Sequence, residues 1–143
     1  MKGSKNGKKL SIGVVVLVVM TSLIMASVAF ASNDNYGYSF YLGSGHQNAY
    51  SGARYRQTSN ENNKWKVNLV YNSEGSGGKA TFWLAKDNKN RTVVSYTHTI
   101  KQGSGAHYYG ATAAASRTNV RLGGENNNSN PCSVSGYWDE ETD

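Results

Sequence analysis

The sequence has a single cysteine, Cys132, which excludes an intramolecular disulfide. A lone thiol is either a small buried hydrophobic group or a reactive group that pairs between chains, and we expect the buried role. Aliphatic residues are also scarce, because only 11 isoleucines, leucines and valines follow residue 31. Ten tyrosines and three tryptophans replace them, each ring able to bury on the order of 150–250 Å². We therefore predict a thin core rich in aromatic side chains.

No catalytic or metal-binding motif stands out. Gly-Ser-Gly tripeptides occur at 43–45, 75–77 and 103–105, yet the Gly-x-Ser-x-Gly pattern of a nucleophile elbow is missing, and flexible turns explain all three. The three histidines lie far apart and lack the paired spacing of metal ligands. We predict a non-enzymatic protein without a cofactor or metal. An enzymatic alternative rests only on the serine- and histidine-bearing glycine loops.

Charge is sparse and unevenly placed. After residue 31 the chain has 11 lysines and arginines against 9 aspartates and glutamates, and four of the acidic residues lie in the last five positions. The basic residues are scattered in runs no longer than two, which argues against nucleic acid as a partner. A mildly basic body is compatible with ordinary solubility or with an anionic wall polymer or phospholipid, and the acidic residues 139–143 are expected to form a solvated tail.

The N-terminus has the order of a secretory signal. Four lysines in the first nine residues precede an apolar run from Leu10 to Val28, and small residues at Ala29 and Ala31 match the pattern that signal peptidase cleaves. We predict a signal peptide over residues 1–31, with Ser32 as the mature N-terminus. The mature protein would be secreted or loosely associated with the wall, without a membrane span. An uncleaved anchor is the alternative, because the run approaches the ~20 residues that span a bilayer.

Period-two alternation of apolar and polar residues predicts strands along the mature chain. The clear strands are at 36–42, 65–71, 79–86 and 92–100, and weaker ones are at 52–58, 117–123 and 133–138. Glycine- and asparagine-rich connections suggest that the second to fourth clear strands form an antiparallel meander, and the alanines of 111–116 allow one helical turn. We predict an all-β domain over residues 32–138, a small antiparallel sandwich or open barrel of about seven strands.

The aromatic residues are also the best candidates for a binding site. Trp83 lies on the opposite face from the apolar residues of its strand, so it is either exposed or covered by another layer. We expect a platform for stacking on sugar rings, assisted by the many asparagines, from Trp83, Tyr108, Tyr109, Tyr137 and Trp138. The competing interpretation assigns these rings to the core. If the rings form a platform, the partner would be a cell-wall glycan or another envelope component. The oligomeric state stays open.

Several segments together resemble a known family. They are Arg54–Thr58, Trp65–Leu69, Phe82–Ala85, Gln102–Tyr109 and Ser135–Thr142. In this order they resemble a family of small secreted proteins of Gram-positive bacteria classed as a domain of unknown function. The resemblance covers nearly the whole mature chain and implies an exported β protein, with no activity to transfer. In size, signal and composition the chain is also similar to lactococcin-972-like bacteriocins, which suggests an alternative role as an antagonist of neighbouring cells.

Overall fold

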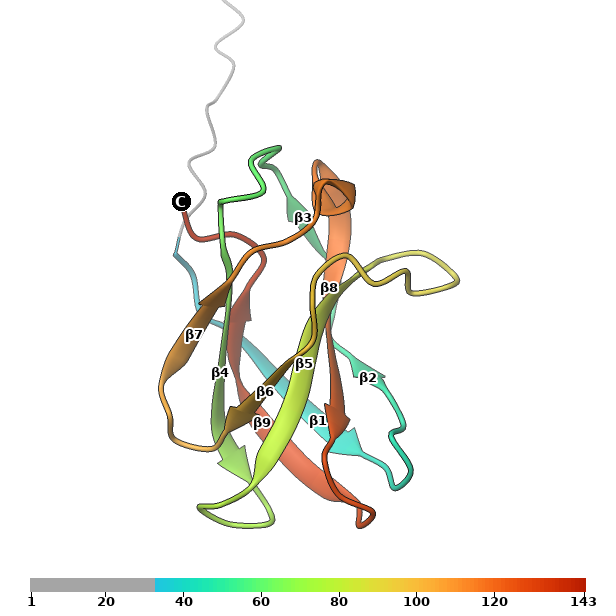
Figure 1. Cartoon of the computed structure of the whole chain (residues 1–143), viewed down its shortest axis with the longest axis vertical. Coiled ribbons are helices and arrows are strands. Elements are labelled where there is room, and N and C mark those ends of the chain that lie inside the picture. Colours follow the sequence, from blue (N-terminus) through green and yellow to red (C-terminus); the bar gives the residue numbers. More distant parts are fainter. Residues whose placement is uncertain (1–32) are drawn as a thin grey trace, which may run out of the picture.

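The computed structural model describes residues 33–143 as two antiparallel sheets packed face to face (Figure 1). The strands are β1 (Tyr36–Leu42), β2 (Ala49–Tyr50), β3 (Arg54–Arg56), β4 (Trp65–Asn72), β5 (Lys79–Lys86), β6 (His98–Lys101), β7 (Ala106–Tyr109), β8 (Thr118–Asn126) and β9 (Cys132–Asp139), with a 3-10 turn η1 (Ala113–Ala115) before β8. Sheet A has the order β1-β9-β4-β7, and sheet B has the order β2-β8-β5-β6, with β3 also paired to β8. The predicted sandwich is confirmed, and the sheets do not close into a barrel.

Aromatic rings fill much of the space between the sheets, as predicted. Trp65, Phe82 and Trp138 are almost fully buried, and the ring of Tyr38 lies 5.0 Å from that of Phe40 and 5.5 Å from that of Phe82. The indole Nε1 of Trp65 donates to the carbonyl of Gly110 at 3.1 Å, so its polar group is satisfied within the fold. Large rings therefore compensate for the shortage of branched aliphatic residues.

The predicted meander is wrong at its first connection. β4 belongs to sheet A, whereas β5 belongs to sheet B, so the glycine-rich segment 73–78 crosses between the layers and does not close a hairpin. The second connection does join paired strands, because β5 pairs antiparallel with β6. Both faces of β5 are buried, which fits a central strand covered on both sides.

Strand boundaries differ from the prediction around residues 92–100. Only His98–Lys101 is a strand, while Val93 forms an isolated bridge with Ala85. Tyr96, which alternation along 92–100 places on the same face as Val94 and Ile100, is 82% exposed. The three weaker strands are confirmed as β3, β8 and β9, and the helical turn as η1. β2 and β7 were not predicted, since two- and four-residue strands show too little alternation to be recognised.

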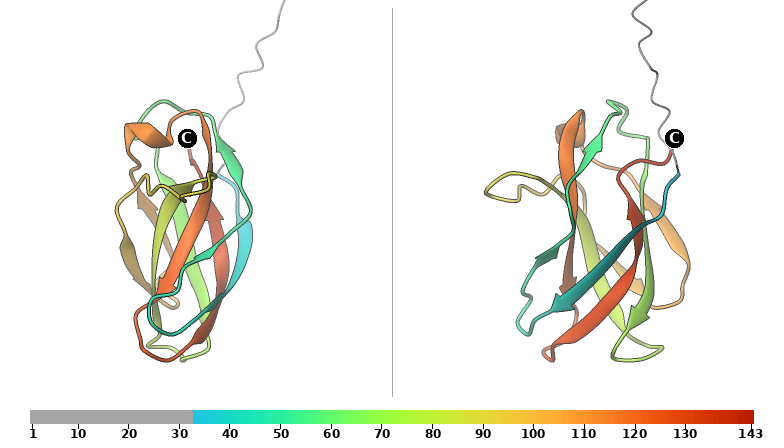
Figure 2. Two further views of the ribbon diagram at one scale, coloured as in Figure 1. Left: turned by 90° about the vertical axis from the view of Figure 1, so that its right-hand side faces the viewer. Right: turned by 180° about the vertical axis from the view of Figure 1, so that it is seen from behind.

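The two ends of the described chain lie side by side (Figures 1 and 2). The backbone N–H of Asp34 donates to the carboxylate of Asp139, which joins the segment before β1 to the end of β9. The predicted signal peptide and its cleavage point, Ala31 and Ser32, fall outside the described residues. Within residues 33–143, no helix has the length and hydrophobicity needed to cross a bilayer.

Candidate functional site

The outer face of sheet A carries four tyrosines. Side chains alternate along each strand, so the residues between the buried ones point away from sheet B. The tyrosines that do so are Tyr41, Tyr71, Tyr108 and Tyr137, one from each strand of the sheet. We call these four residues the tyrosine face.

Strand register arranges the tyrosine face as a diagonal band. Tyr41 on β1 is opposite Ser133, Tyr71 on β4 is opposite Ser135, and Tyr137 on β9 is opposite Asn68. Tyr108 on β7 is opposite Lys66 at the far end of the band. Because neighbouring strands are about 4.8 Å apart, the four strands spread these rings over about 14 Å across the sheet.

The tyrosine face is open to solvent and interleaved with uncharged polar groups. Tyr41 is 70% exposed, Tyr71 50% and Tyr108 44%, while Tyr137 is partly buried. Hydroxyl and amide groups lie between the rings, from Ser39, Asn68, Ser133 and Ser135. The face therefore offers apolar ring surface together with hydrogen-bond donors and acceptors.

Two charged residues belong to this side of sheet A, and both are buried. Lys66 and Asp139 are direct partners across β4 and β9, and each is 2% exposed. The Lys66 ammonium donates to the side-chain oxygens of Asn33 and Asn35, the latter at 2.9 Å, and lies 5.7 Å from the ring centroid of Tyr137. A ligand on the open part of the face thus meets rings, hydroxyls and amides.

The structure separates the five aromatic residues selected from the sequence. Tyr108 and Tyr137 share the outer face of sheet A, but Trp138 is in the core, 1% exposed. Tyr109 points inward and stacks on His98 at 3.5 Å between ring centroids. Trp83 is covered on the outer side of sheet B, 4% exposed. A single platform of all five rings is therefore excluded, and ligand binding by Tyr108 and Tyr137 stays a prediction.

Sequence reasoning missed the other two members of the tyrosine face. The signal for Tyr41 is in the sequence, because it is the one aromatic residue that shares a side of its strand with Gly37 and Ser39. Strict alternation along 65–71 places Tyr71 on the apolar face with Trp65, Val67 and Leu69, but the β4–β9 register shifts between Leu69 and Tyr71. This bulge turns Tyr71 outward and buries Asn72, which is 1% exposed.

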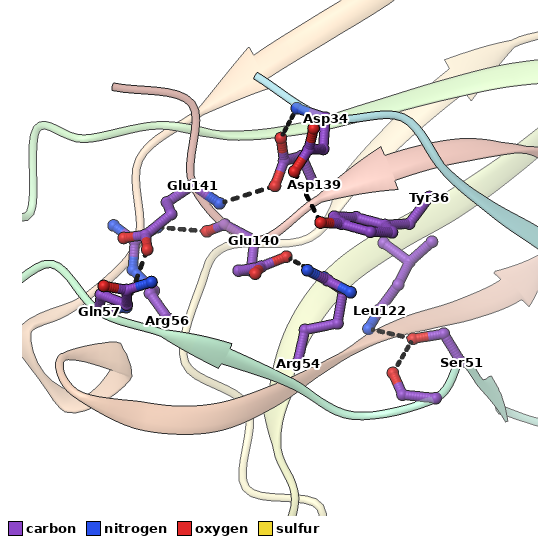
Figure 3. Close-up of polar contacts among 11 residues, drawn as sticks. Asp34, Tyr36, Ser51, Arg54, Arg56, Gln57, Leu122, Asp139, Glu140 and Glu141 are labelled. Carbon is purple, nitrogen blue, oxygen red and sulfur yellow. Dashed lines mark hydrogen bonds and ion pairs between the residues drawn. The ribbon is translucent and has the colours of Figure 1, made fainter. Parts of the chain in front are cut away.

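The acidic C-terminus is folded against β3, contrary to the expectation of a solvated tail (Figure 3). Asp139, Glu140 and Glu141 are at most 6% exposed. Glu140 accepts from Arg54 Nε at 2.6 Å, and the Glu141 carboxylate accepts the backbone N–H groups of residues 57 and 58 at 2.9 and 2.8 Å. The run of acidic residues predicted a solvated tail, whereas its partners come from more than 80 residues away.

Arg56 ties this cluster together from the inside. Its guanidinium, 1% exposed, donates to the carbonyl of Glu140 and to that of Asn63, the latter at 2.5 Å. Next to it, the Arg54 guanidinium lies 3.0 Å from the centroid of the Tyr36 ring. Between β2 and β3, Ser51 Oγ accepts the backbone N–H of Leu122 at 2.9 Å, which ties this segment to β8 (Figure 3). The charges of this cluster are therefore committed to holding β3, β9 and the C-terminus together.

Two groups at the edge of the cluster, Asp139 and Tyr36, have pKa values above their ordinary values. Burial is the main cause that raises the pKa of Asp139 to about 7, with the charge of Glu140 adding to it and the Asp34 N–H and Lys66 opposing it. The Tyr36 hydroxyl donates to Asp34 at 2.6 Å, and this bond raises the pKa of Tyr36 to about 12. Both shifts arise from contacts that close the fold.

One glycine loop does bring a serine to a histidine. Ser104 Oγ lies 2.8 Å from His107 Nε2, but the same hydroxyl donates to the carbonyl of Lys101 at 2.7 Å. A hydroxyl that donates to a carbonyl receives its other hydrogen bond from the histidine, the reverse of a base that removes the serine proton. Within residues 33–143, no third side chain bonds the other ring nitrogen of His107, and no group of three or more metal-ligating side chains gathers.

Fold and surface together define a small two-layer β-sandwich with an uncharged tyrosine face and a buried ionic cluster closing its termini. The chain belongs to the family described as "Protein of unknown function (DUF2712)", whose model matches residues 25–142. No curated protein and no solved structure matches the chain.

Proposed function

We propose that this is a secreted, non-enzymatic binding protein that attaches to uncharged glycan chains of the cell wall through its tyrosine face. The observation that carries the proposal is the band of Tyr41, Tyr71, Tyr108 and Tyr137 across sheet A, where the charged strand residues Lys66 and Asp139 are buried. The signal sequence predicted at residues 1–31 supports a site of action outside the cell.

The chemistry of the face favours a sugar. Tyrosine gives a large, rigid contact surface at low entropic cost, and serine, glycine and asparagine give adaptable hydrogen bonds. Sugar rings have both an apolar face of C–H groups and an edge of hydroxyls, which match rings and polar side chains respectively. Ser39, Ser133, Ser135 and Asn68 stand between the rings where such hydroxyls would lie.

The distribution of charge argues against an anionic ligand on this face. The one cation among its strands, Lys66, is 2% exposed and already bound to Asn33 and Asn35. Attraction to a polyanion requires accessible lysine or arginine on the binding surface. We therefore assign a neutral glycan, and not teichoic acid or nucleic acid, to the tyrosine face.

A pull-down on purified peptidoglycan and on neutral wall glycans tests the proposal. The mature protein should be retained at low and at moderate salt, because no exposed charge is involved. The double substitution Tyr71→Ala and Tyr108→Ala should weaken retention by roughly 5- to 150-fold, since each ring contributes about 0.5–1.5 kcal/mol of contact. Tyr96→Ala is the matched control, because Tyr96 is 82% exposed but lies outside sheet A. No retention at low salt, or equal losses in both variants, would refute the proposal.

A bacteriocin-like role is the second candidate, supported by small size, the predicted export signal and the similarity in composition noted above. Purified mature protein added to related strains would then inhibit growth. If binding to wall glycan is also found, the Tyr71→Ala and Tyr108→Ala protein decides whether inhibition depends on it. Uniform inactivity against a panel of strains would remove this candidate.

A further inference from the structure

β1 is an edge strand without the features that usually block an edge. It is seven residues long, contains no charged residue and no proline, and pairs with β9 without a register shift. The other edges within residues 33–143 are shorter, namely β2 with two residues, β3 with three, and β6 and β7 with four each. A long uncharged edge presents unpaired N–H and C=O groups that another strand can use.

On the side away from β9, β1 lies near β2 and β8 but pairs with neither, and its two ends make side-chain contacts there. The carbonyl of Leu42 accepts from Asn126 Nδ2 at 3.3 Å, and the Arg54 guanidinium covers the ring of Tyr36. Between these ends, β9 is the only strand paired with residues 37–41 in the described part of the chain. Figure 2 (right) shows β1 at the border of its sheet with β9 along one side.

The sequence of β1 is complementary to itself when read antiparallel. A two-fold axis at Ser39 places Ser39 opposite its own copy, Tyr38 opposite Phe40, and Gly37 opposite Tyr41. Aromatic pairs stabilise cross-strand contacts, and an aromatic ring compensates for a glycine opposite it. The Gly37–Tyr41 pair fits this well, because Tyr41 is 70% exposed and nothing lies within 4 Å of a β-carbon built on Gly37.

We propose that β1 pairs antiparallel with β1 of a second copy of this chain, about a two-fold axis at Ser39. Two four-stranded sheets A become one eight-stranded sheet, through an isologous contact of the kind that closes a dimer. The tyrosine faces of the two copies join into one surface, with Tyr41 and its symmetry mate at its centre. The proposal does not depend on glycan binding.

Disulfide trapping tests both the pairing and its register. Residues opposite each other in antiparallel strands have α-carbons about 4.5–5.5 Å apart, which is within the range that a disulfide spans. Ser39→Cys should therefore form a covalent dimer on mild oxidation with diamide. Gly37→Cys alone should not, because the two copies of residue 37 are offset by four residues, about 14 Å along the strands. Mixing Gly37→Cys with Tyr41→Cys protein should restore the cross-link. Wild type is the background control, because its only thiol, Cys132, is 2% exposed.

Sedimentation of the unmodified chain gives an independent measurement. Wild type should show a concentration-dependent dimer, and Ser39→Lys should shift it to monomer by placing two like charges directly opposite each other. Ser133→Lys, an exposed change one strand inward, is the matched control and should leave the dimer intact. Circular dichroism confirms that each variant is folded. A wild type that stays monomeric at millimolar concentration, or equal cross-linking of Ser39→Cys and Gly37→Cys, would overturn the proposal.

Discussion

Trp83 on β5 and Gly123 on β8 are direct partners in sheet B, and the indole lies where a side chain at position 123 would be. The edge of the same indole meets the ring of Tyr50 at 6.2 Å with an interplanar angle of 86°. Glycine thus creates the space that lets a tryptophan lie flat on the outer side of the sheet. This explains how a ring on the polar side of its strand becomes 4% exposed.

Gly123→Ala should therefore destabilise the fold. Its β-carbon would overlap with Cε2 and Nε1 of Trp83, and overpacking of this kind costs about 1–3 kcal/mol. Urea denaturation followed by circular dichroism measures the loss. Gly37→Ala is the matched strand glycine, with open space around its β-carbon, and should be close to neutral. Equal stability of the two variants would contradict this account of Trp83.

Arg56→Leu should be among the most damaging single substitutions in the chain. It leaves the carbonyls of Asn63 and Glu140 without their buried donor and removes the cation beside Glu141. Breaking such a buried arrangement costs about 3–5 kcal/mol. The measurement is the free energy of unfolding from urea denaturation. Arg117→Leu, at an exposed position, is the control and should stay within about 0.5 kcal/mol of wild type. A loss below 1 kcal/mol would show that Arg56 does not hold the C-terminus.

The strands could be predicted from sequence because alternation is a local property. Tyr36–Leu42 and Lys79–Lys86 appear with the predicted boundaries. Sheet membership is not local, so the glycine-rich 73–78 connection looked like a hairpin although it joins different sheets. The bulge after Leu69 also left no signal, since a single extra residue only reverses the phase of those that follow.

The candidate site was only partly predictable for the same reason. Tyr108 is a candidate because glycines flank its segment, and Tyr137 because it lies near the C-terminus, and both are properties of sequence position. Whether a ring faces solvent depends on what packs over it, and Trp83 needed Gly123, 40 positions away, to be buried. Asp139–Glu141 looked like a solvated acidic run because their partners come from distant segments, as Arg54 and Arg56 of β3 do for Glu140.

Cys132 should be unreactive in the folded protein. It is 2% exposed, and burial together with the charge of Glu74 raises the pKa of its thiol, so little thiolate is present at neutral pH. Ellman's reagent should label it only after denaturant unfolds the chain. If one equivalent of thiol reacts within minutes under native conditions, the start of β9 around Cys132 opens readily.

The closure of the two termini at Asp139 should weaken as pH rises through neutrality. Its carboxyl accepts the N–H of Asp34 and lies near Glu140, Lys66 and the backbone of Glu141, and its pKa in the fold is about 7 against an ordinary value of 3.8. A folded-state pKa above the unfolded one means that the native state holds the proton more tightly. The corresponding stability is fully present below about pH 4 and is lost as pH rises through 7. Asp87 acts in the opposite sense, because hydrogen bonds from Arg121 and Arg91 lower its pKa and its contribution is lost in acid.

Asp139→Asn isolates this effect, because the amide oxygen still accepts the Asp34 N–H but cannot ionise. Between pH 5 and pH 8 the unfolding free energy of wild type should fall relative to that of the variant by more than about 1 kcal/mol. Denaturation curves at both pH values give the difference, and Asp143→Asn, at the exposed chain end, serves as the control that should run parallel to wild type. Parallel profiles for wild type and Asp139→Asn would mean that Asp139 is ionised throughout this range. In that case Lys66 and the Asp34 N–H, which favour the charged carboxylate, outweigh burial and Glu140 at the junction of the termini.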